Sequence, residues 1–459
     1  IQDKWLTLTI AAIMRKFAEF FNILYAFYLL LHLMLNPTHS VRAIFEKNGG
    51  KSFMAGKTIL ILGGGVGGIV TANALRQRLG NEHRIVVVDK RGEYLYSPSL
   101  LWVMVGWRRP EQITRDLRSL LRPGVEILRG EVQEIDTTRS SVRVDGQALD
   151  YDYLVIALGA SLDPEVLSGY KETAHNFFDL DGAAALWTAL QRFEGGRAVV
   201  LVSGLPYKCP ASPYEAAMLL DDALRRRGLR PRCQIDVFTP EALPMPVAGP
   251  GMGEAVVTML KSKGIAFHPT QQVDHIDPQA KALVFADGRR EPFDLLAAVP
   301  PHRPPAAGKA SPLANEAGWI PVNKHTLATK VENVYAIGDV ASITLANGRP
   351  LPKAGVFAHA QGEVVAERIA AAVRGTETQA QFDGAGYCWL ETGGGSAGFT
   401  SGEFYAEPDP RVSMPRSGRL WHWGKVLFEQ YWLDAGFKRE MARWGLTLGA
   451  RLFKIPASL

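Results

Sequence analysis

Cysteine is scarce in this chain, and its scarcity limits the chemistry that cysteine can perform here. The 459 residues include only three, Cys209, Cys233 and Cys388. Three cysteines are too few for a disulfide-stabilised scaffold, and their spacing matches no CxxC or Cys/His zinc site, so no metal is expected. Cys209 and Cys388 lie 179 positions apart, so a bond between them would be a redox-active link between distant segments. The alternative is that both are small buried hydrophobic residues.

Excess charge and long basic runs are also absent. Lys and Arg total 51 against 46 Asp and Glu, which gives a formal charge of +5. No run of basic residues interleaved with aromatic ones occurs along the main part of the chain, so the sequence predicts no nucleic-acid partner. With 47% hydrophobic and 21% charged residues, the chain has a globular composition and enough length for two or three domains.

An almost wholly apolar segment occupies residues 20–35. Sixteen helical residues would span roughly 24 Å, which is less than the ~30 Å hydrocarbon core of a bilayer. No small-x-small cleavage site follows, so the segment favours a short membrane-associated helix over a secretory signal. Met54 and the residues after it resemble a start of translation, which makes residues 1–53 an N-terminal hydrophobic extension without a role in the catalytic fold.

The C-terminal stretch combines large apolar side chains with cations. Aromatic and basic residues on one amphipathic element suit the headgroup layer of a membrane, which predicts monotopic attachment. The alternative is a helix packed on the protein's own surface. The residues concerned are Trp421, Trp423, Lys425, Phe428, Tyr431, Trp432, Phe437, Lys438, Arg439, Arg443, Trp444, Leu446, Leu448, Arg451, Leu452, Phe453 and Lys454.

A dinucleotide fingerprint begins after the apolar run at residues 58–62. Gly63, Gly65 and Gly68 have GxGxxG spacing, in which the glycines permit a tight turn, approach of a pyrophosphate and close helix–strand packing. The helix N-terminus then favours the phosphates. A second apolar strand ends in Asp89, whose carboxylate is placed to accept hydrogen bonds from a ribose. This order of elements predicts a bound dinucleotide.

Two later segments favour FAD over NAD. Residues 151–160 form an apolar strand with a glycine turn at Gly159, and residues 333–340 form a strand that ends in Gly338-Asp339. These segments look like the strand-to-turn motifs of flavoproteins with two dinucleotide-binding domains. That resemblance implies that the Asp339 carboxylate holds the ribityl chain of FAD.

The second nucleotide loop lacks its glycines. Residues 198–204 read as a buried strand that leads into Leu205-Pro206-Tyr207-Lys208-Cys209-Pro210. The two prolines remove N–H donors that a pyrophosphate would use. The sequence therefore predicts that the nicotinamide site is lost and that thiol chemistry takes its place.

From about residue 54 to 432 the chain resembles the sulfide:quinone oxidoreductases and the related flavocytochrome c sulfide dehydrogenases. The pair of cysteine segments is specific to these proteins, whereas the other two segments are shared with membrane NADH dehydrogenases. The four segments are residues 96–106, 206–215, 352–362 and 387–395.

The resemblance implies that Cys209 and Cys388 form a redox disulfide beside the flavin and that sulfide attacks one sulfur. Lys208 would favour a thiolate at Cys209. Lys353 would place a cation and a helix N-terminus at the flavin pyrimidine edge, unless it is a solvated surface lysine. Glu215 would act as a general base or would cap the helix that starts near Pro213. Further cofactor contacts are expected at Lys90, Pro98 and Val132.

One departure from the family pattern is visible. Many sulfide:quinone oxidoreductases carry a further cysteine before the position of Cys209, but residues 160–205 contain none. Cys233 begins a predicted strand and is expected to be structural. His268, His275 and His302 belong to no recognised motif, and we expect them to be satisfied polar histidines.

The predicted fold is α/β, with two doubly wound Rossmann-like domains and a C-terminal amphipathic membrane-associating region. We expect an FAD-binding domain in residues 54–160 and 310–380, a redox-cysteine domain in 161–309, and a membrane-associating region in 381–459. The leading function is membrane-bound oxidation of sulfide to sulfur or polysulfide with FAD and quinone, at the inner membrane, in a possible homo-oligomer. The alternatives are a cytochrome-coupled sulfide dehydrogenase, a type II NADH:quinone oxidoreductase and a flavin-binding assembly subunit.

Overall fold

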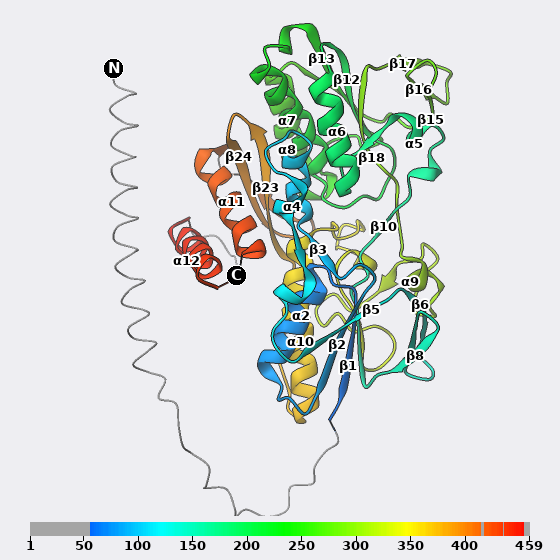
Figure 1. Ribbon diagram of the computed structural model, residues 1–459, viewed down its shortest axis with the longest axis vertical. Coiled ribbons are helices and arrows are strands. Elements are labelled where there is room, and N and C mark those ends of the chain that lie inside the picture. Colours follow the sequence, from blue (N-terminus) through cyan, green and yellow to red (C-terminus); the bar gives the residue numbers. More distant parts are fainter. Residues whose placement is uncertain (1–55, 415–416, 435, 454–459) are drawn as a thin grey trace, which may run out of the picture. The chain divides into compact units, whose positions relative to one another are not determined.

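Two parallel sheets organise the chain in the computed structural model (Figure 1). The structure describes residues 56–414, 417–434 and 436–453, which belong to one unit, Ala55–Leu459. The expected N-terminal extension and its short membrane helix lie outside the described residues.

The first sheet has five parallel strands in the order β21-β9-β1-β2-β5. Both faces of the sheet are covered, which is why β1 is continuously apolar. Ile59 and Ile61 face the core under helices α2 and α10, while Leu60 and Leu62 face the antiparallel strands β6, β7 and β8. The elements are β1 (Thr58–Leu62), α2 (Val66–Arg78), β2 (Arg84–Asp89), β5 (Val125–Arg129), β6 (Val132–Asp136), β7 (Ser141–Val144), β8 (Gln147–Asp150), β9 (Tyr153–Ile156), β21 (Val334–Ala336) and α10 (Gly355–Arg374).

The second sheet repeats this plan with the order β11-β18-β12-β13-β14, again all parallel. An antiparallel three-stranded sheet again precedes the strand that returns to the centre. The prediction of two doubly wound units is therefore confirmed. The elements are β11 (His175–Asn176), α6 (Leu180–Arg192), β12 (Gly196–Val202), α7 (Ser212–Arg226), β13 (Cys233–Phe238), α8 (Pro250–Ser262), β14 (Ile265–His268), β15 (Val273–Asp277), β16 (Ala282–Phe285), β17 (Arg290–Pro292) and β18 (Leu295–Val299).

Two short strands connect the sheets, and a hairpin and two helices complete the chain. The connecting strands β10 (Ser161–Leu162) and β19 (His302–Arg303) pair antiparallel. The hairpin consists of β23 (Ala385–Gly393) and β24 (Ser396–Glu403), and α11 (Arg419–Leu433) packs against it (Figure 1). The last helix is α12 (Gly436–Phe453).

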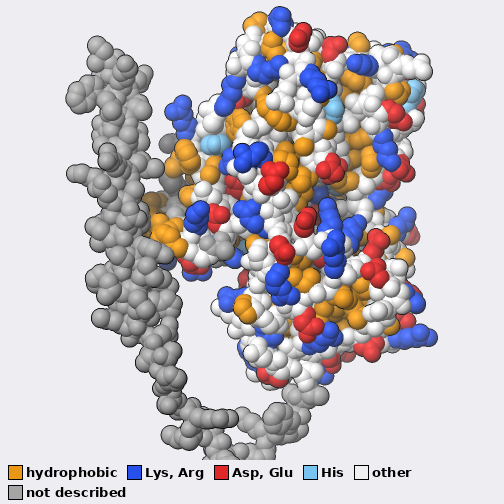
Figure 2. All heavy atoms as spheres, viewed as in Figure 1, with side chains coloured by type: hydrophobic (Ala, Val, Ile, Leu, Met, Phe, Trp, Pro, Cys, Tyr) orange, Lys and Arg blue, Asp and Glu red, His pale blue; other side chains and the backbone are white. Residues whose placement is uncertain are grey.

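The C-terminal stretch is two helices with different surroundings, not one amphipathic element as predicted. In α11, Phe428, Tyr431 and Trp432 are buried, because their rings pack on Tyr387, Trp389 and each other. Lys425 is buried as well and pairs with Glu215. Large apolar side chains remain exposed at the start of α11 and along α12, where Figure 2 shows hydrophobic surface; they are Leu420, Trp423, Phe437, Trp444, Leu448 and Leu452. Among the described residues, no helix is long and apolar enough to cross a membrane.

Candidate active site

The first loop has the geometry that the three glycines predicted. Gly63 has a φ of +106°, and a Cβ there would lie 2.4 Å from the carbonyl oxygen of Ala157. A Cβ at Gly68 would lie 1.9 Å from the carbonyl oxygen of Gly63, so α2 could not pack on β1. The space around Gly65 is open, which leaves room for a phosphate at the N-terminus of α2.

The carboxylate of Asp89 lies against this loop. Its Oδ2 accepts a hydrogen bond of 2.9 Å from Gly64 N–H, and its Oδ1 accepts from the turn that follows β2. Asp89 thus lies where the ribose of a dinucleotide is bound in this fold. Of the other expected contacts, Val132 begins β6, Gly159 lies after β9 with a φ of +70°, and Lys90 and Pro98 are exposed.

Lys353 is not a solvated surface lysine. Its ammonium donates a hydrogen bond to the carbonyl oxygen of Asp339 and lies 3.6 Å from the centroid of the Trp319 ring. Burial lowers the pKa of Lys353 to about 8. As predicted, a helix, α10, begins two residues later at Gly355. The structure therefore brings Lys353 and the Gly338-Asp339 turn together.

A small cavity opens beside this pair, and its lining includes Gly338, Lys353, Ala354, Phe357 and Gln361. Gln361 accepts a hydrogen bond of 2.7 Å from Gly338 N–H through its Oε1, which fixes the turn. A positive-φ glycine turn, a buried cation and a helix N-terminus around one cavity fit the flavin end of FAD. The glycine loop and Asp89 fit the other end of the cofactor.

Cys209 is anchored to the same place. Its backbone N–H donates to the carbonyl oxygen of Lys353 at 2.8 Å, and its own carbonyl accepts from Ser212 N–H at 2.9 Å. Cys209 has a φ of +54°, in the left-handed region that non-glycine residues seldom occupy. Such conformations gather at active sites.

The expected effect of Lys208 on the Cys209 thiol is outweighed. Burial and the neighbouring Glu215 raise the pKa of Cys209 to about 12, although Lys425 and Lys208 act in the opposite direction. Burial also raises the pKa of Cys388 well above its ordinary value, and the charges of Cys209 and Glu215 add to this effect. The two thiols and Glu215 therefore share one electrostatic environment. No disulfide joins cysteines within the described part of the chain.

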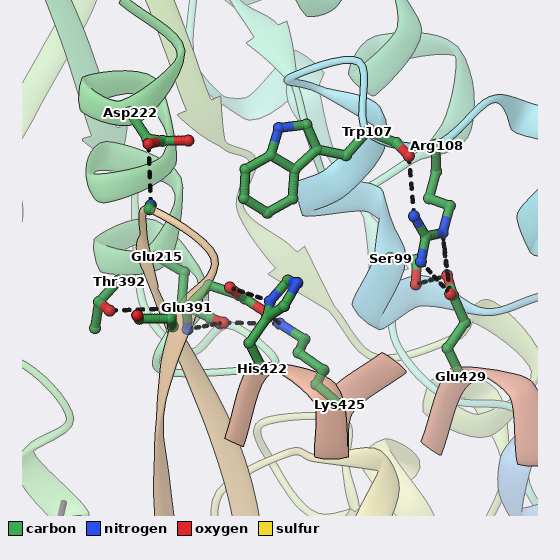
Figure 3. A network of polar contacts seen from close by, with 12 residues as sticks. Ser99, Trp107, Arg108, Glu215, Asp222, Glu391, Thr392, His422, Lys425 and Glu429 are labelled. Atoms are coloured by element: carbon green, nitrogen blue, oxygen red, sulfur yellow. Dashed lines mark hydrogen bonds and ion pairs between the residues drawn. The ribbon is translucent and has the colours of Figure 1, made fainter. Parts of the chain in front are cut away.

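Glu215 belongs to a buried ionic network that the sequence did not predict (Figure 3). Its Oε1 accepts hydrogen bonds from Lys425 Nζ at 3.0 Å and from Glu391 N–H at 2.9 Å. Lys425 Nζ lies 4.0 Å from the Glu391 carboxylate, which also pairs with His422 Nδ1 at 3.0 Å. Both glutamates are at most 1% exposed as whole residues. Glu215 thus pairs with α11 and does not cap α7, in whose first turn it lies.

The pKa values of Glu215 and Lys425 reflect their burial and their pairing. Burial raises the pKa of Glu215, and Lys425 opposes that shift. Burial lowers the pKa of Lys425, but Glu215 and Glu391 outweigh it, so the net shift is upward. The Ser99–Arg108–Glu429 cluster, with an Arg108–Glu429 distance of 2.8 Å, attaches α11 to the segment after β3 (Glu93–Leu95) in the same way.

The second unit has an acidic residue where a nucleotide-binding unit would hold a ribose. Glu241 follows β13 as Asp89 ends β2, but it is 5% exposed and faces inward. Tyr207 donates a hydrogen bond of 2.8 Å to Glu241 Oε2, and Tyr214 donates to the same oxygen. Burial raises the pKa of Glu241, which the tyrosine hydroxyls oppose. Tyr207 and Tyr214 therefore occupy the carboxylate oxygen that a ribose would need.

Sequence patterns do not identify several of these charged residues. The run of rings and cations at the C-terminus predicts a lipid-facing Lys425, whereas the structure buries it. Glu391, His422 and Glu241 belong to no motif with a known role. Glu391 lies in residues 387–395, one of the four segments that resemble the sulfide:quinone oxidoreductases, and this was the only indication that it could belong to the site. Cys233 begins β13 and is buried, in agreement with its structural assignment.

Comparison with known proteins gives these features a family context. Residues 57–362 match the protein family described as pyridine nucleotide-disulphide oxidoreductase. The mitochondrial sulfide:quinone oxidoreductase of Mus musculus is 27% identical over 418 residues, which cover 85% of this chain and 90% of that protein. The sulfide-quinone reductase of Aquifex aeolicus is 26% identical over 392 residues, which cover 82% and 90%.

A solved structure shares the fold. The X-ray structure of the sulfide:quinone oxidoreductase from Aquifex aeolicus matches with a TM-score of 0.74 and 24% identity, over 88% of this chain and 96% of that one. The match extends beyond the two sheets to most of the described chain.

Proposed function

Because this chain belongs to the pyridine nucleotide-disulphide oxidoreductase family, we propose that it is an FAD-dependent sulfide:quinone oxidoreductase. The relatives with that name cover most of the chain, and the chain covers 90% of the first of them. Electrons pass from sulfide to Cys209 and Cys388, then to FAD and finally to a quinone.

The observation that carries this proposal is the altered second loop. A member that binds NADH needs a glycine turn after β12 and a free acid after β13. Here the turn contains Cys209 between prolines, and Glu241 is bound by Tyr207 and Tyr214. A dithiol donor replaces the nicotinamide at the same edge of the sheet.

FAD, when bound, accepts two electrons at its isoalloxazine ring. We assign Gly63, Gly65, Gly68 and Asp89 to the dinucleotide end, and Gly338, Asp339 and Lys353 to the flavin end. Negative charge near a buried cation is stabilised, so Lys353 and the N-terminus of α10 favour the reduced cofactor. We also propose that the cofactor contacts four further residues, Lys90, Pro98, Val132 and Gly159. The domain limits are those predicted above.

The two cysteines supply the covalent chemistry in this proposal. Hydrosulfide attacks one sulfur of a Cys209–Cys388 disulfide, which forms a cysteine persulfide and releases the other cysteine as a thiolate. Lys425 lies close enough to lower the pKa of both thiols, so it stabilises that thiolate. Glu215, held by Lys425 at 3.0 Å, is the carboxylate placed to exchange a proton with the pair.

Quinone and membrane belong to the same proposal. Exposed Phe437, Trp444, Leu448 and Leu452 on α12 are costly to leave in water and suit a headgroup layer. Arg443 and Arg451 accompany them on the helix and suit anionic lipid. We therefore propose that α12 attaches the protein to the inner membrane without crossing it, and a quinone then reaches the flavin from the lipid.

A comparison of acceptors tests both the acceptor and the attachment. A protein that lacks residues 1–53 is compared with a variant that also ends at Asp434, and residues 1–53 are deleted from both because that segment could anchor the chain alone. We expect both to reduce a short-chain quinone with sulfide, because the cysteines and cofactor contacts precede residue 435. Only the longer protein should float with liposomes, and it should reduce a long-tailed quinone at least about tenfold faster.

The remaining outcomes discriminate the alternatives. If the shortened protein still floats, α12 is not the anchor. A full-length protein that fails to bind lipid and reduces cytochrome c in preference to quinone is a cytochrome-coupled sulfide dehydrogenase. A protein without sulfide turnover under any condition supports the non-catalytic assembly subunit.

A further inference from the structure

His302 has a buried ring nitrogen without a partner. It begins β19, and only 1% of its surface is exposed. Its Nδ1 lies 2.8 Å from the carbonyl oxygen of Pro300. Because a carbonyl oxygen only accepts, Nδ1 carries the proton and Nε2 presents a lone pair. Among the described residues, Nε2 has no hydrogen-bond partner. The expectation of a fully satisfied histidine was therefore wrong for this residue.

An aromatic ring packs against His302, and two lysines lie near enough to act on it electrostatically. The Phe178 ring meets it edge to face at a centroid distance of 5.4 Å. Burial lowers the pKa of His302 to about 3, and the positive charges of Lys208 and Lys353 contribute. The imidazole is therefore neutral at working pH and acts as a hydrogen-bond acceptor. A buried acceptor left unpaired is unfavourable, which calls for a ligand with a donor.

His302 lies at an edge of the second sheet that can bind ligands. It lies just after β18, at the carboxyl edge of the second sheet, where open α/β sheets bind their ligands. The end of β12, which leads to the cysteine loop, is bonded to β18 through Ser203 N–H and Val299 O at 3.3 Å. Lys208 directly precedes Cys209, whose backbone is bonded to Lys353. The residues that carry the lone pair and the two positive charges are therefore connected to the loop of Cys209, either by backbone hydrogen bonds or by sequence.

We infer that His302 Nε2 and the Lys208 ammonium form the binding site for hydrosulfide before it attacks the cysteine pair. This inference rests on the proposed function. Hydrosulfide carries one negative charge and one S–H bond, so Lys208 meets its charge and Nε2 accepts its hydrogen. The free sulfur lone pairs then attack one sulfur of the Cys209–Cys388 disulfide. One S–S bond breaks and one forms, the proton stays on the persulfide, and a thiolate leaves, so the step needs no other oxidant.

Two substitutions at His302 separate binding from structure. Asn keeps a donor near the Nδ1 position for the Pro300 carbonyl but removes the Nε2 acceptor, whereas Gln places an acceptor near Nε2. In His302→Asn, the sulfide concentration for half-maximal anaerobic flavin reduction should rise about tenfold, with a limiting rate changed less than about threefold. His302→Gln should recover most of this loss. His275→Asn, at a histidine on the exposed part of β15, should match the wild type.

The possible results distinguish this inference from the proposed function. A wild-type flavin that sulfide does not reduce overturns the proposed function itself. A wild-type flavin that is reduced, beside an unchanged half-saturating concentration in His302→Asn, overturns only the hydrosulfide site. The same holds if the FAD content of His302→Asn falls while its flavin-loaded fraction responds to sulfide as the wild type does, because Nε2 then serves the cofactor.

A spectroscopic measurement covers the case in which His302→Asn does not fold. Histidine is labelled with ¹⁵N in the Cys209→Ser protein, where sulfide binds without forming a persulfide. The His302 signal is assigned by its absence in the additional His302→Gln variant. Adding sulfide should shift the Nε2 resonance of His302, and an unmoved resonance would contradict the site.

Discussion

Replacing either redox cysteine is expected to abolish sulfide oxidation and to leave the cofactor bound. Cys209→Ser and Cys388→Ser should each lower sulfide-dependent flavin reduction by more than about a thousandfold, because a serine hydroxyl cannot form the disulfide that sulfide attacks. The FAD content should stay near the wild-type value, since the glycine loop, Asp89 and the Gly338-Asp339 turn do not depend on the thiols. Stopped-flow absorbance of the flavin and the absorbance ratio of the purified proteins provide both measurements.

Cys233→Ser is the matched control. Cys233 is buried at the start of β13, and its thiol donates to the carbonyl oxygen of Leu229. A serine preserves that hydrogen bond, so sulfide oxidation should remain within about twofold of the wild type. Near-normal turnover in either of the first two variants would return those cysteines to a structural role. An equal loss in all three would show that the wrong pair was assigned.

Removing the cation of the buried network is expected to destabilise the protein strongly. Lys425→Met leaves Glu215 and Glu391, each at most 1% exposed, without the ammonium that lies 3.0 and 4.0 Å from them. Breaking a buried ion pair on one side costs about 3–5 kcal/mol, because an uncompensated charge remains. The free energy of unfolding in urea at pH 8 should fall by that amount. Lys438→Met, at an exposed lysine of α12, should change it by less than about 0.5 kcal/mol.

The loss of folding stability caused by Lys425→Met should be larger at high pH than at low pH. Burial already raises the pKa of Glu215, and loss of Lys425 removes a cation that opposes that shift. The folded variant then binds protons more tightly than the unfolded chain, so its stability falls as pH rises above the unfolded carboxyl pKa. The difference from wild type should be smaller at pH 5 than at pH 8. A Glu215→Gln substitution added to Lys425→Met should recover part of the loss, and equal deficits at both pH values would contradict the ionic explanation.

Local patterns predicted the backbone geometry of the two glycine turns. Gly63, Gly65, Gly68 and Asp89 are close in sequence, and the steric reasons for each glycine depend on one strand–turn–helix unit. The same is true of Gly338-Asp339, which is bonded to Lys353 only 14 residues later. Within such short spacing, sequence order determines the geometry, and the two parallel sheets follow from continuous apolar strands.

Contacts between distant segments could not be predicted in this way. Lys425 and Glu215 are 210 positions apart, and the run of rings and cations around Lys425 is compatible with either a lipid-facing or a buried helix. Packing of α11 on the hairpin β23–β24 decides between them. Likewise, nothing near Glu241 indicates that Tyr207, 34 positions earlier, occupies its carboxylate. His302, whose Nε2 has no partner among the described residues, lies on β19, and no local motif indicates that β19 pairs with β10.

The central claim is that the cysteine loop has replaced a nicotinamide site, and the identity of the electron donor tests it most directly. The purified, FAD-loaded protein is mixed anaerobically with sulfide and, in a separate experiment, with NADH, while the flavin absorbance is followed. We expect sulfide to bleach the flavin rapidly and NADH to leave it oxidised, because Cys209 and the occupied Glu241 leave no place for a pyrophosphate or a ribose. Rapid bleaching by NADH with no response to sulfide would contradict the account.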